Sequence, residues 1–445
     1  MDSASKEIHI YHADAGAGKT RKLMDIISQH VEAGVPLHRI AFVTYTRAAA
    51  EVAKQRVCER FGVNIKEAPH FRTIHSMCFQ RTGAKANLMM DNEKYLDFGK
   101  KAGYEFSAYV GSKDLDSVDW QHLKDDEIVS FEQLYRNHPN KAQWILDNKI
   151  DNLDFVRYCK EYVKYKRTFG YVDFTDLLEK YIDDDYFEDV DVACIDEAQD
   201  CTPLQWKVLF KAFRYAKYIY IVGDEKQSIY TYNGAEPRIL LNMKGQQHTL
   251  EKSFRVPRTI NNFVRKHIVS DMEDITPTGL LSEHEGGEVK YITNIDELPA
   301  INLSKSYLFL CRNRKFFATW ERWCQQNCIP YSIKNKPLFS NEEKMQFRDG
   351  LTQNWEPNRL ALAQRYYAKR TFYEQPVVRI DTIHGVKGDE ADIVVLLSDI
   401  SRLTWKEMEE NPTSEHRVFY VGCTRAREIL YIVSPETKYY YSYLF

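Results

Sequence analysis

In the segment ADAGAGKT, two alanines and two glycines alternate directly before Lys19 and Thr20. The apolar run IHIYH precedes this segment, and TRKLMDIISQHV follows it with helical periodicity. A strand followed by a glycine-rich loop and then a helix is the arrangement of a phosphate-binding loop. In such a loop backbone N–H groups surround the phosphates, the lysine supplies positive charge and the threonine hydroxyl reaches Mg²⁺. Ala13 stands where the strict pattern has glycine, and a small residue still permits the turn. The segment predicts a nucleotide-binding loop, with a flexible turn as the alternative.

A second group of residues suited to chemistry is the acidic pair in ACIDEAQD, which ends another apolar run. Asp196 is placed to hold Mg²⁺ through its water shell, and Glu197 to orient and deprotonate an attacking water. A solvated pair of charges is the alternative. Because the pair follows a phosphate loop in one α/β unit, nucleotide hydrolysis is the favoured interpretation, and a kinase would not need the second carboxylate.

Candidates for contact with the terminal phosphate lie further along the chain. Gln227 follows the strand-like run YIYIVGD, and Arg255 and Arg425 occur in EKSFRVP and YVGCTRARE. Phosphoryl transfer needs positive charge on the developing oxyanion. Each arginine alone is more often a surface charge. If both act on one nucleotide, that nucleotide lies between two α/β domains, and hydrolysis opens and closes a cleft.

The elements that must position these residues are short apolar runs separated by helical patterns. Nine runs are predicted as strands buried on both faces, which is typical of parallel sheets: Ile8–Tyr11, Ile40–Thr44, Val192–Ile195, Tyr218–Val222, Val289–Ile292, Tyr307–Leu310, Val377–Ile380, Ile393–Leu396 and Ile429–Val433. Residues 84–167 have helical patterns without the apolar strand-like runs between them, and this predicts a helical insertion. Residues 271–288 predict a loop, and the acidic cluster 183–191 a solvated loop.

Composition limits the function classes. The 445 residues suggest two to four domains at roughly 100–200 residues each. A net charge of −3 excludes holding a polyanion through a global positive field, so nucleic-acid binding would need a local groove with stacking. No apolar run approaches the roughly 20 residues that span a bilayer. The scattered nine cysteines and the absence of a signal-peptide core predict a reduced, cytoplasmic setting, with Cys324 and Cys328 as buried thiols rather than metal ligands.

Motifs in one order over nearly the whole chain resemble the UvrD/Rep/PcrA-type DNA helicases of superfamily 1. They are ADAGAGKT, FVTYTRAAAEVAKQRV, RTIHSMCF, VDFTDLL, CIDEAQD, IVGDEKQSIYTYNGA, LEKSFR, IDTIHGVKGDEADIVVL and FYVGCTRARE. The resemblance implies an α/β fold of two tandem RecA-like P-loop domains with parallel sheets. The implied domains are the first motor at 1–83 and 168–248, with the helical insertion at 84–167, and the second motor at 249–339 and 376–445. Residues 340–375 are then a reduced remnant of a second accessory insertion.

The resemblance also implies ATP and Mg²⁺ as cofactors and assigns site residues. Those of the nucleotide site are Ala15, Gly16, Ala17, Gly18, Lys19, Thr20 and Arg21 in the loop, Phe254 on adenine, Glu390 near the ribose, Thr20 and Asp196 for the metal, and Glu197, Gln227, Arg255 and Arg425 for catalysis. Those of the DNA track are Tyr45, Thr73, His75, Tyr230, Tyr232, Thr382 and His384. For each tyrosine ordinary packing is the alternative, and for the Thr and His residues a helix cap or core hydrogen bond.

Some residues depart from the family pattern. Strand one starts almost at the N-terminus, so we expect the adenine-reading segment to be missing and nucleotides other than ATP to be admitted. Tyr232 stands where Trp is usual and Asn233 where Arg is usual, and Asp389 and Ala391 replace an apolar pair around Glu390. The acids Asp173 and Asp176 of VDFTDLL either touch the DNA track or cap the following helix.

The sequence therefore predicts an ATP-dependent 3′→5′ DNA helicase that translocates on single-stranded DNA. Its expected partners are single strands, duplex junctions with a 3′ tail and proteins of replication or repair, in the cytoplasm of a bacterium or of a virus-infected cell, with no membrane. The alternatives are a translocase that displaces proteins with little unwinding, an RNA helicase, and a nucleotide-gated DNA-binding factor without catalysis. The aromatic tail KYYYSYLF either docks a partner or packs against the second motor.

Overall fold

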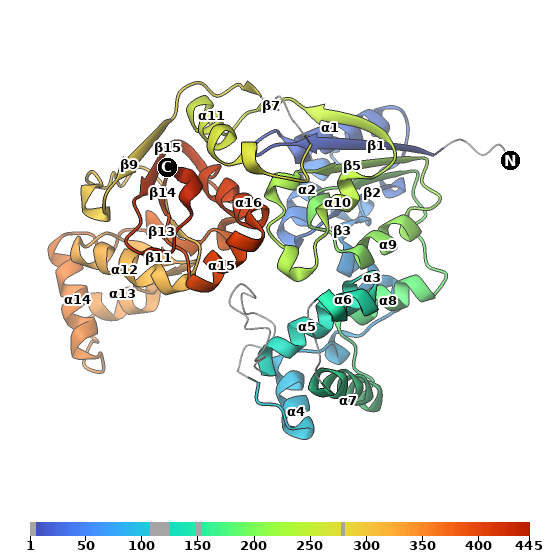
Figure 1. Cartoon of the computed structure of the whole chain (residues 1–445), viewed down its shortest axis with the longest axis horizontal. Coiled ribbons are helices and arrows are strands. Elements are labelled where there is room, and N and C mark those ends of the chain that lie inside the picture. Colours follow the sequence, from blue (N-terminus) through green and yellow to red (C-terminus); the bar gives the residue numbers. More distant parts are fainter. Residues whose placement is uncertain (1–5, 107–124, 148–152, 277–280) are drawn as a thin grey trace. The chain divides into compact units, whose positions relative to one another are not determined.

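The computed structural model describes residues 6–106, 125–147, 153–276 and 281–445. The chain divides into two compact units. The first comprises Met1–Asp14, Gly18–Leu250 and Asp274–Thr278, and the second comprises Ala15–Ala17, Glu251–Glu273 and Gly279–Phe445. Each unit has a largely parallel sheet with helices against it, and a set of helices is inserted in the first (Figure 1). The predicted fold class, α/β with two tandem RecA-like domains, is confirmed.

The described strands of the first unit form a six-stranded parallel sheet in the order β3-β2-β4-β5-β1-β6. Their bounds are β1 Glu7–Ala13, β2 Ile40–Thr44, β3 Phe71–Thr73, β4 Val192–Ile195, β5 Tyr218–Gly223 and β6 Gln246–Leu250. Strands β2 and β4 are buried along their whole length. Burial on both faces explains why their sequences are nearly continuous apolar runs.

Helices cover both faces of this sheet, and successive strand residues alternate between them. The helices of the motor core are α1 Lys19–Glu32, α2 Arg47–Phe61, α3 Ile74–Thr82, α8 Phe174–Asp183, α9 Pro203–Ala212 and α10 Pro237–Leu241. Phe42 and Cys194 pack with residues of α1 and α2, whereas Val43 and Ile195 pack with residues of α3, α8 and α9. The two cores hold the strand ends in fixed relative positions.

The inserted helices are α4 Asn92–Ala102, α5 Asp125–Asn137, α6 Lys141–Asp147 and α7 Leu153–Phe169. Residues 107–124 and 148–152 of the predicted insertion lie outside the described residues. The helices share an aromatic core that includes Phe98, Phe131, Tyr158 and Tyr162. Asp173 caps α8 by accepting from the Asp176 backbone N–H at 2.7 Å, so the capping interpretation of this acid is confirmed.

The described strands of the second unit form a seven-stranded sheet in the order β12-β11-β13-β10-β14-β15-β9, parallel except for the β11–β12 pair. Strand bounds are β7 Lys252–Ser253, β8 Leu281–Ser282, β9 Glu288–Ile292, β10 Tyr307–Cys311, β11 Tyr331–Ile333, β12 Lys336–Pro337, β13 Val378–Thr382, β14 Ala391–Leu397 and β15 Ala426–Val433. All nine runs predicted as strands are strands. The region 271–288, predicted as a loop, contains β8, which pairs with β7.

The helices of the second unit are α11 Arg258–His267, α12 Phe317–Gln326, α13 Asn341–Arg348, α14 Pro357–Ala368, α15 Arg402–Glu410 and α16 Pro412–Cys423. Helix α12 packs its tryptophans on one face of the sheet. Helices α13 and α14 lie within residues 340–375, where one or two helices were expected. In the tail, Tyr441 is fully buried and stacks on Phe419 with ring centroids 3.9 Å apart, so the tail packs within this unit rather than standing free.

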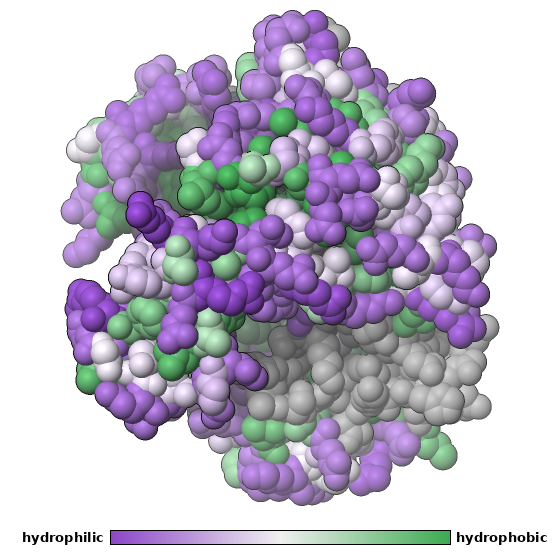
Figure 2. Space-filling model, turned by 90° about the vertical axis from the view of Figure 1, so that its left-hand side faces the viewer, coloured by the Kyte–Doolittle hydropathy of each residue, from purple (hydrophilic) through white to green (hydrophobic). Residues whose placement is uncertain are grey.

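The surface carries mainly hydrophilic residues, with separate hydrophobic patches, on the face drawn in Figure 2. Among the described helices, none combines the length and apolarity that crossing a bilayer would demand. Cys324 and Cys328 are buried free thiols, as expected.

Glu188 is the exception in the predicted solvated acidic loop 183–191, where Asp184, Asp185 and Asp189 are exposed as expected. The Glu188 side chain is 1% exposed and accepts two hydrogen bonds from Arg81, at 2.8 and 3.0 Å. His70 Nδ1 lies 2.9 Å and Arg72 Nη2 3.7 Å from the carboxylate. Burial acts to raise the pKa of Glu188, but the hydrogen bonds from His70 and Arg81 and the charge of Arg72 outweigh it and lower the pKa to about 2.

We expect Glu188→Gln to destabilise the first unit by about 3 kcal/mol at pH 7, because it leaves buried cations without their anion. The folded pKa lies below the ordinary value of 4.5, so the stabilisation is complete above pH 4.5 and is lost as the pH falls towards 2. Urea denaturation of both proteins at neutral and acid pH measures this. Asp185→Asn, at an exposed ion pair of the same cluster, should change little. Equal midpoints for Glu188→Gln and wild type at pH 7 would contradict the assignment.

Candidate functional site

The loop after β1 has the backbone geometry of a phosphate cradle. Gly16 and Gly18 have φ angles of 76° and 74°, a region in which side chains are strained, so glycine is needed at both positions. Helix α1 begins at Lys19, and its N-cap residue, Gly18, has no side chain with which to cap the first N–H groups. Ala15 and Ala17 are buried in this loop, and Arg21 is exposed on the first turn of α1. The loop therefore offers backbone donors and the positive end of a helix to an anion.

Acidic residues from two neighbouring strands surround Lys19. Thr20 Oγ1 donates to Asp196 Oδ2 at 2.7 Å. Lys19 Nζ lies 3.9 Å from Glu197 Oε2 and 4.0 Å from Asp224 Oδ2. Burial raises the pKa of Asp196 and of Asp224 to about 6, with the charge of Glu197 adding to the shift at Asp196. Sequence reasoning did not assign Asp224, although its place at the end of a buried strand is the same signal that singled out Asp196.

The Thr20 hydroxyl and the Asp196 carboxylate form a donor set that suits Mg²⁺. Mg²⁺ prefers oxygen ligands, keeps several waters and is commonly shared between one or two carboxylates and substrate phosphates. No cluster of three or more His, Cys, Asp or Glu side chains within the described part of the chain could hold a metal by itself. The residues present therefore fit a cation that is shared with a bound phosphate.

Two glutamines connect the acids at the ends of β4 and β5. Gln199 Nε2 donates to Glu197 Oε2 at 2.6 Å, and Gln199 Oε1 accepts from the Asp224 backbone N–H at 2.9 Å. Gln227 Nε2 donates to Asp224 Oδ2. Glu197 has a φ of 54°, a left-handed conformation that costs a non-glycine residue about 1–2 kcal/mol. Gln199 was not singled out from the sequence.

A buried ion pair joins the first part of the loop to the segment after β5. Lys226 Nζ lies 2.6 Å from Asp14 Oδ1, with side chains 1% and 5% exposed. Burial acts to lower the pKa of Lys226, but the charges of Asp14 and Asp224 outweigh it and raise the pKa. The pair fixes the phosphate loop relative to the segment that carries Asp224 and Gln227.

Aromatic rings gather beyond the acids, on the side of β2. Tyr45 follows β2, and its ring stacks on Tyr230 with centroids 5.6 Å apart and planes 14° from parallel. Tyr232 meets Tyr230 edge to face at 6.1 Å. Burial raises the pKa of Tyr45 to about 12, so its hydroxyl stays protonated at neutral pH. The three tyrosines present π faces of the kind on which bases stack.

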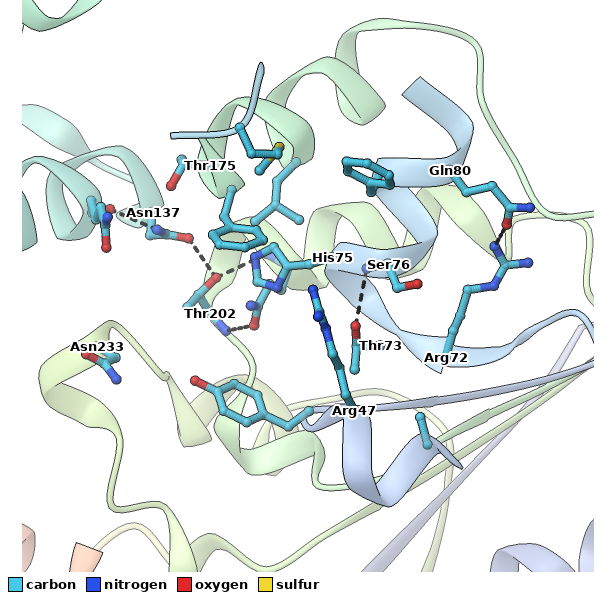
Figure 3. A pocket seen from close by; sticks show the side chains of 18 of the residues that line it. Arg47, Arg72, Thr73, His75, Ser76, Gln80, Asn137, Thr175, Thr202 and Asn233 are labelled. Carbon is cyan, nitrogen blue, oxygen red and sulfur yellow. Dashed lines mark hydrogen bonds between the residues drawn. The ribbon is translucent and has the colours of Figure 1, made fainter. Parts of the chain in front are cut away.

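A cavity of about 1050 Å³ opens beside Tyr45. Its lining combines basic, hydroxyl and amide side chains from α2, β3, α3, α5, α8 and α9 (Figure 3). Thr73, which caps α3, and His75 line it as well, and the His75 ring lies next to Thr202. Thr202 Oγ1 donates to Asn137 Oδ1 at 2.9 Å, which ties the inserted helix α5 to the start of α9.

Arginines and Lys54, rather than the histidine, supply positive charge to this cavity, and Glu51 adds a negative charge. Arg47 and Arg72 line it, and Arg72 donates to Gln80. Burial, with the charge of Arg47, lowers the pKa of His75 to about 4, so its imidazole is neutral at physiological pH. A neutral ring beside the arginines can stack or donate one hydrogen bond. Neither Arg47 nor Asn137 was assigned to this cavity from the sequence. Arg47 could have been found because it directly follows the TYT motif, whereas Asn137 lies in the helical insertion, where no motif marks it.

The second unit holds the other predicted site residues. Arg425 is 1% exposed, and its Nε donates to the Val421 carbonyl at 2.9 Å. Arg255 Nε lies 3.6 Å from Glu390 Oε2. The remaining three are Phe254, which is exposed, Thr382, which is the last residue of β13, and His384, which lies in the turn that follows. The Thr382 hydroxyl accepts from the Gly385 N–H.

Comparison with known proteins agrees with these features. Residues 3–248 match the UvrD/REP helicase N-terminal domain, and residues 340–437 match the UvrD-like helicase C-terminal domain. The ATP-dependent DNA helicase Rep of Buchnera aphidicola (subspecies Baizongia pistaciae) is 23% identical over 74% of this chain and 53% of that protein. A probable DNA helicase II homologue of Mycoplasma pneumoniae is 27% identical over 54% of this chain and 36% of that protein.

Among solved structures, an arterivirus nonstructural protein 10 (helicase) aligns with 97% of this chain and 60% of its own, at 10% identity and a TM-score of 0.39. The chain spans about half the length of the Buchnera protein and a smaller share of the Mycoplasma protein. The N-terminal match alone covers more than half of the chain. The chain belongs to the UvrD/REP helicase family.

Proposed function

We propose that this chain is an ATP-dependent DNA helicase that moves 3′→5′ along single-stranded DNA. The proposal rests chiefly on one arrangement: the carboxyl edge of a single parallel sheet carries a phosphate loop, an acid pair and an aromatic, arginine-bearing cavity in succession. Family membership supports it, and so do the printed names of the relatives, which are ATP-dependent or probable DNA helicases.

In this proposal the loop N–H groups and Lys19 bind the outer phosphates of ATP. Thr20 and Asp196 hold Mg²⁺, which when bound neutralises charge on the phosphate oxygens. Glu197, held near Lys19, orients and deprotonates the attacking water. Arg255 and Arg425 of the second unit, with Gln227, supply positive charge and hydrogen bonds to the terminal phosphate.

The nucleic acid would occupy the cavity beside Tyr45. Its bases stack on Tyr45, Tyr230 and Tyr232 without regard to sequence, while Arg47 and Arg72 attract the phosphates. A stacked base is worth about 1–3 kcal/mol, and a DNA base-pair step costs about 1.4 kcal/mol. Because these values are comparable, the transfer of a base between rings can bias strand opening without trapping the protein.

Lys19→Ala and Glu197→Gln should each abolish most DNA-stimulated ATP hydrolysis. We expect kcat to fall by about 10²–10⁴-fold for Glu197→Gln, because the base that activates water is lost. Steady-state phosphate release with saturating oligo-dT measures this. Lys406→Ala and Glu409→Gln, at exposed positions of α15, are matched controls that should hydrolyse ATP normally. If Glu197→Gln turned over ATP at the wild-type rate, its catalytic assignment would be wrong.

Tyr45→Ala should weaken binding of single-stranded DNA by about 1–3 kcal/mol, which corresponds to a roughly 5- to 150-fold higher Kd, because one stacking face is removed. Tyr45→Phe keeps the ring and should bind like wild type. Fluorescence anisotropy of labelled oligo-dT at one fixed salt concentration measures both. Tyr373→Ala removes an exposed ring elsewhere and serves as the control. Unchanged affinity of Tyr45→Ala would place the nucleic acid away from this cavity.

Duplexes with a 3′ or a 5′ single-stranded tail test polarity and unwinding together. We expect ATP-dependent strand separation of the 3′-tailed duplex only. Removal of streptavidin from a 5′-biotinylated strand without unwinding would instead identify a translocase, a reading favoured by the small size of the α13–α14 segment. Competition between DNA and RNA of one sequence tests the choice of nucleic acid, since stacking alone does not detect the 2′-hydroxyl.

A further inference from the structure

Gln199 is fully buried, and both ends of its side-chain amide are engaged in the candidate site. Its Nε2 donates to Glu197 Oε2 at 2.6 Å and, more weakly, to Asp200 Oδ2 at 3.5 Å. Its Oε1 accepts from the Asp224 backbone N–H at 2.9 Å. A primary amide carries its donor and acceptor in one rigid plane. The Asp224 N–H, directly after β5, therefore sets the direction in which Nε2 donates.

The space around this amide is tight. A Cβ added to Gly223 would lie 3.1 Å from Gln199 Oε1 and 3.3 Å from the Gln199 backbone N. A side chain at position 223 would therefore press on this amide, and the hydrogen bond from the adjacent Asp224 N–H holds it against the end of β5. The Glu197 side chain, in contrast, is one-third exposed and would sample several rotamers without a partner. The hydrogen bond from Gln199 selects one of them.

The same residue is joined to the aromatic stack through its backbone. Ser228 Oγ donates to the Gln199 carbonyl at 3.0 Å. Ser228 lies two positions before Tyr230, in a compact segment in which the backbone N–H of Gln227 bonds to Asp224 and that of Ile229 to Gln227. A base that enters between the rings of Tyr45 and Tyr230 must open their stack, and Tyr230 is tied through this short segment to Gln199.

We propose that Gln199 is a positioning residue that holds the Glu197 carboxylate for hydrolysis and transmits the state of the Tyr45–Tyr230 stack to it. The inference deepens the proposed function and depends on it. In the absence of nucleic acid the rings stack on each other, and the amide holds one carboxylate geometry. Entry of a base displaces Tyr230 and Ser228, and the resulting shift of Gln199 resets Glu197. The rate of ATP hydrolysis thereby depends on whether a base of the nucleic acid lies between Tyr45 and Tyr230.

Gln199→Met preserves volume and removes all three hydrogen bonds of the amide, those with Glu197, Asp200 and the Asp224 N–H. In the full chain, we expect kcat of the oligo-dT-stimulated ATPase to fall by about 10- to 100-fold, while KM for ATP and Kd for oligo-dT change by less than about twofold. Gln325→Met deletes a comparable amide bond, to the Tyr331 hydroxyl, and is the matched control. A purely structural role for Gln199 would change KM, Kd and thermal stability together with kcat.

A double-mutant cycle tests whether Gln199 acts through Glu197. In a Glu197→Gln background, single-turnover hydrolysis should be insensitive to Gln199→Met, because the group that the amide positions is already lost. Ser228→Ala keeps the Gln199–Glu197 bond and removes the link to the stack. It should retain the DNA-free ATPase rate within about twofold and lose most of the stimulation by oligo-dT.

The outcomes separate this inference from the proposed function. A wild-type chain without ATPase activity in the presence of oligo-dT refutes the proposed function. An active wild type with Gln199→Met at the wild-type kcat, or with independent effects of Gln199→Met and Glu197→Gln, overturns the positioning role. Full stimulation of Ser228→Ala by oligo-dT overturns the link to the aromatic stack.

Discussion

The common direction of the strands in the first sheet is the constraint on which the candidate site depends. Parallel strands end at one edge, so β1, β4 and β5 bring Lys19, Asp196 and Asp224 together from positions far apart in the chain. Strands β2 and β3 deliver Tyr45 and Thr73 to the same edge. Strand β4 lies between β2 and β5, so the segment after β4 is next to both the acids around Lys19 and the residues around Tyr45. Glu197 and Gln199 are in that segment.

Charge at this edge is balanced only in part by the protein. Asp14 has Lys226 as a close buried partner, whereas Asp196 and Asp224 share the more distant Lys19. Burial disfavours the two carboxylates, which is why their pKa values are raised. A phosphate alone would add negative charge beside them, and a cation alone would leave the loop donors without an anion. This balance of charge supports our proposal that a cation and a phosphate bind together, as in a metal-bound nucleotide.

The sequence predicted those parts of the fold that depend on local pattern. The nine apolar strands have continuous hydrophobicity and were found, and the loop after β1 has the left-handed glycines that its pattern requires, while its binding of phosphate stays a prediction. Strand β3 is three residues long and β6, QQHTL, is a polar edge strand, so neither carries that pattern. The error at Glu188 has another origin, because an acidic run looks solvated until the fold brings Arg81 and His70 to it. The bonds of Gln199 to the Asp224 N–H and of Asn137 to Thr202 join positions distant in the chain, and composition cannot reveal such contacts.

The helical insertion is a structural part of the cavity rather than an appendage. Helix α5 places Asn137 on the cavity wall, and the preceding Arg136 donates to Asp173 and Asp176 at the start of α8. Lys166 of α7 reaches the same two carboxylates. Removing one partner from such a buried cluster costs about 3–5 kcal/mol, so α5 and α7 are held firmly to the motor core. Helices α5 and α8 both line the cavity, and the charged cluster joins them to each other. The insertion therefore cannot move without altering the surface that we assign to the nucleic acid.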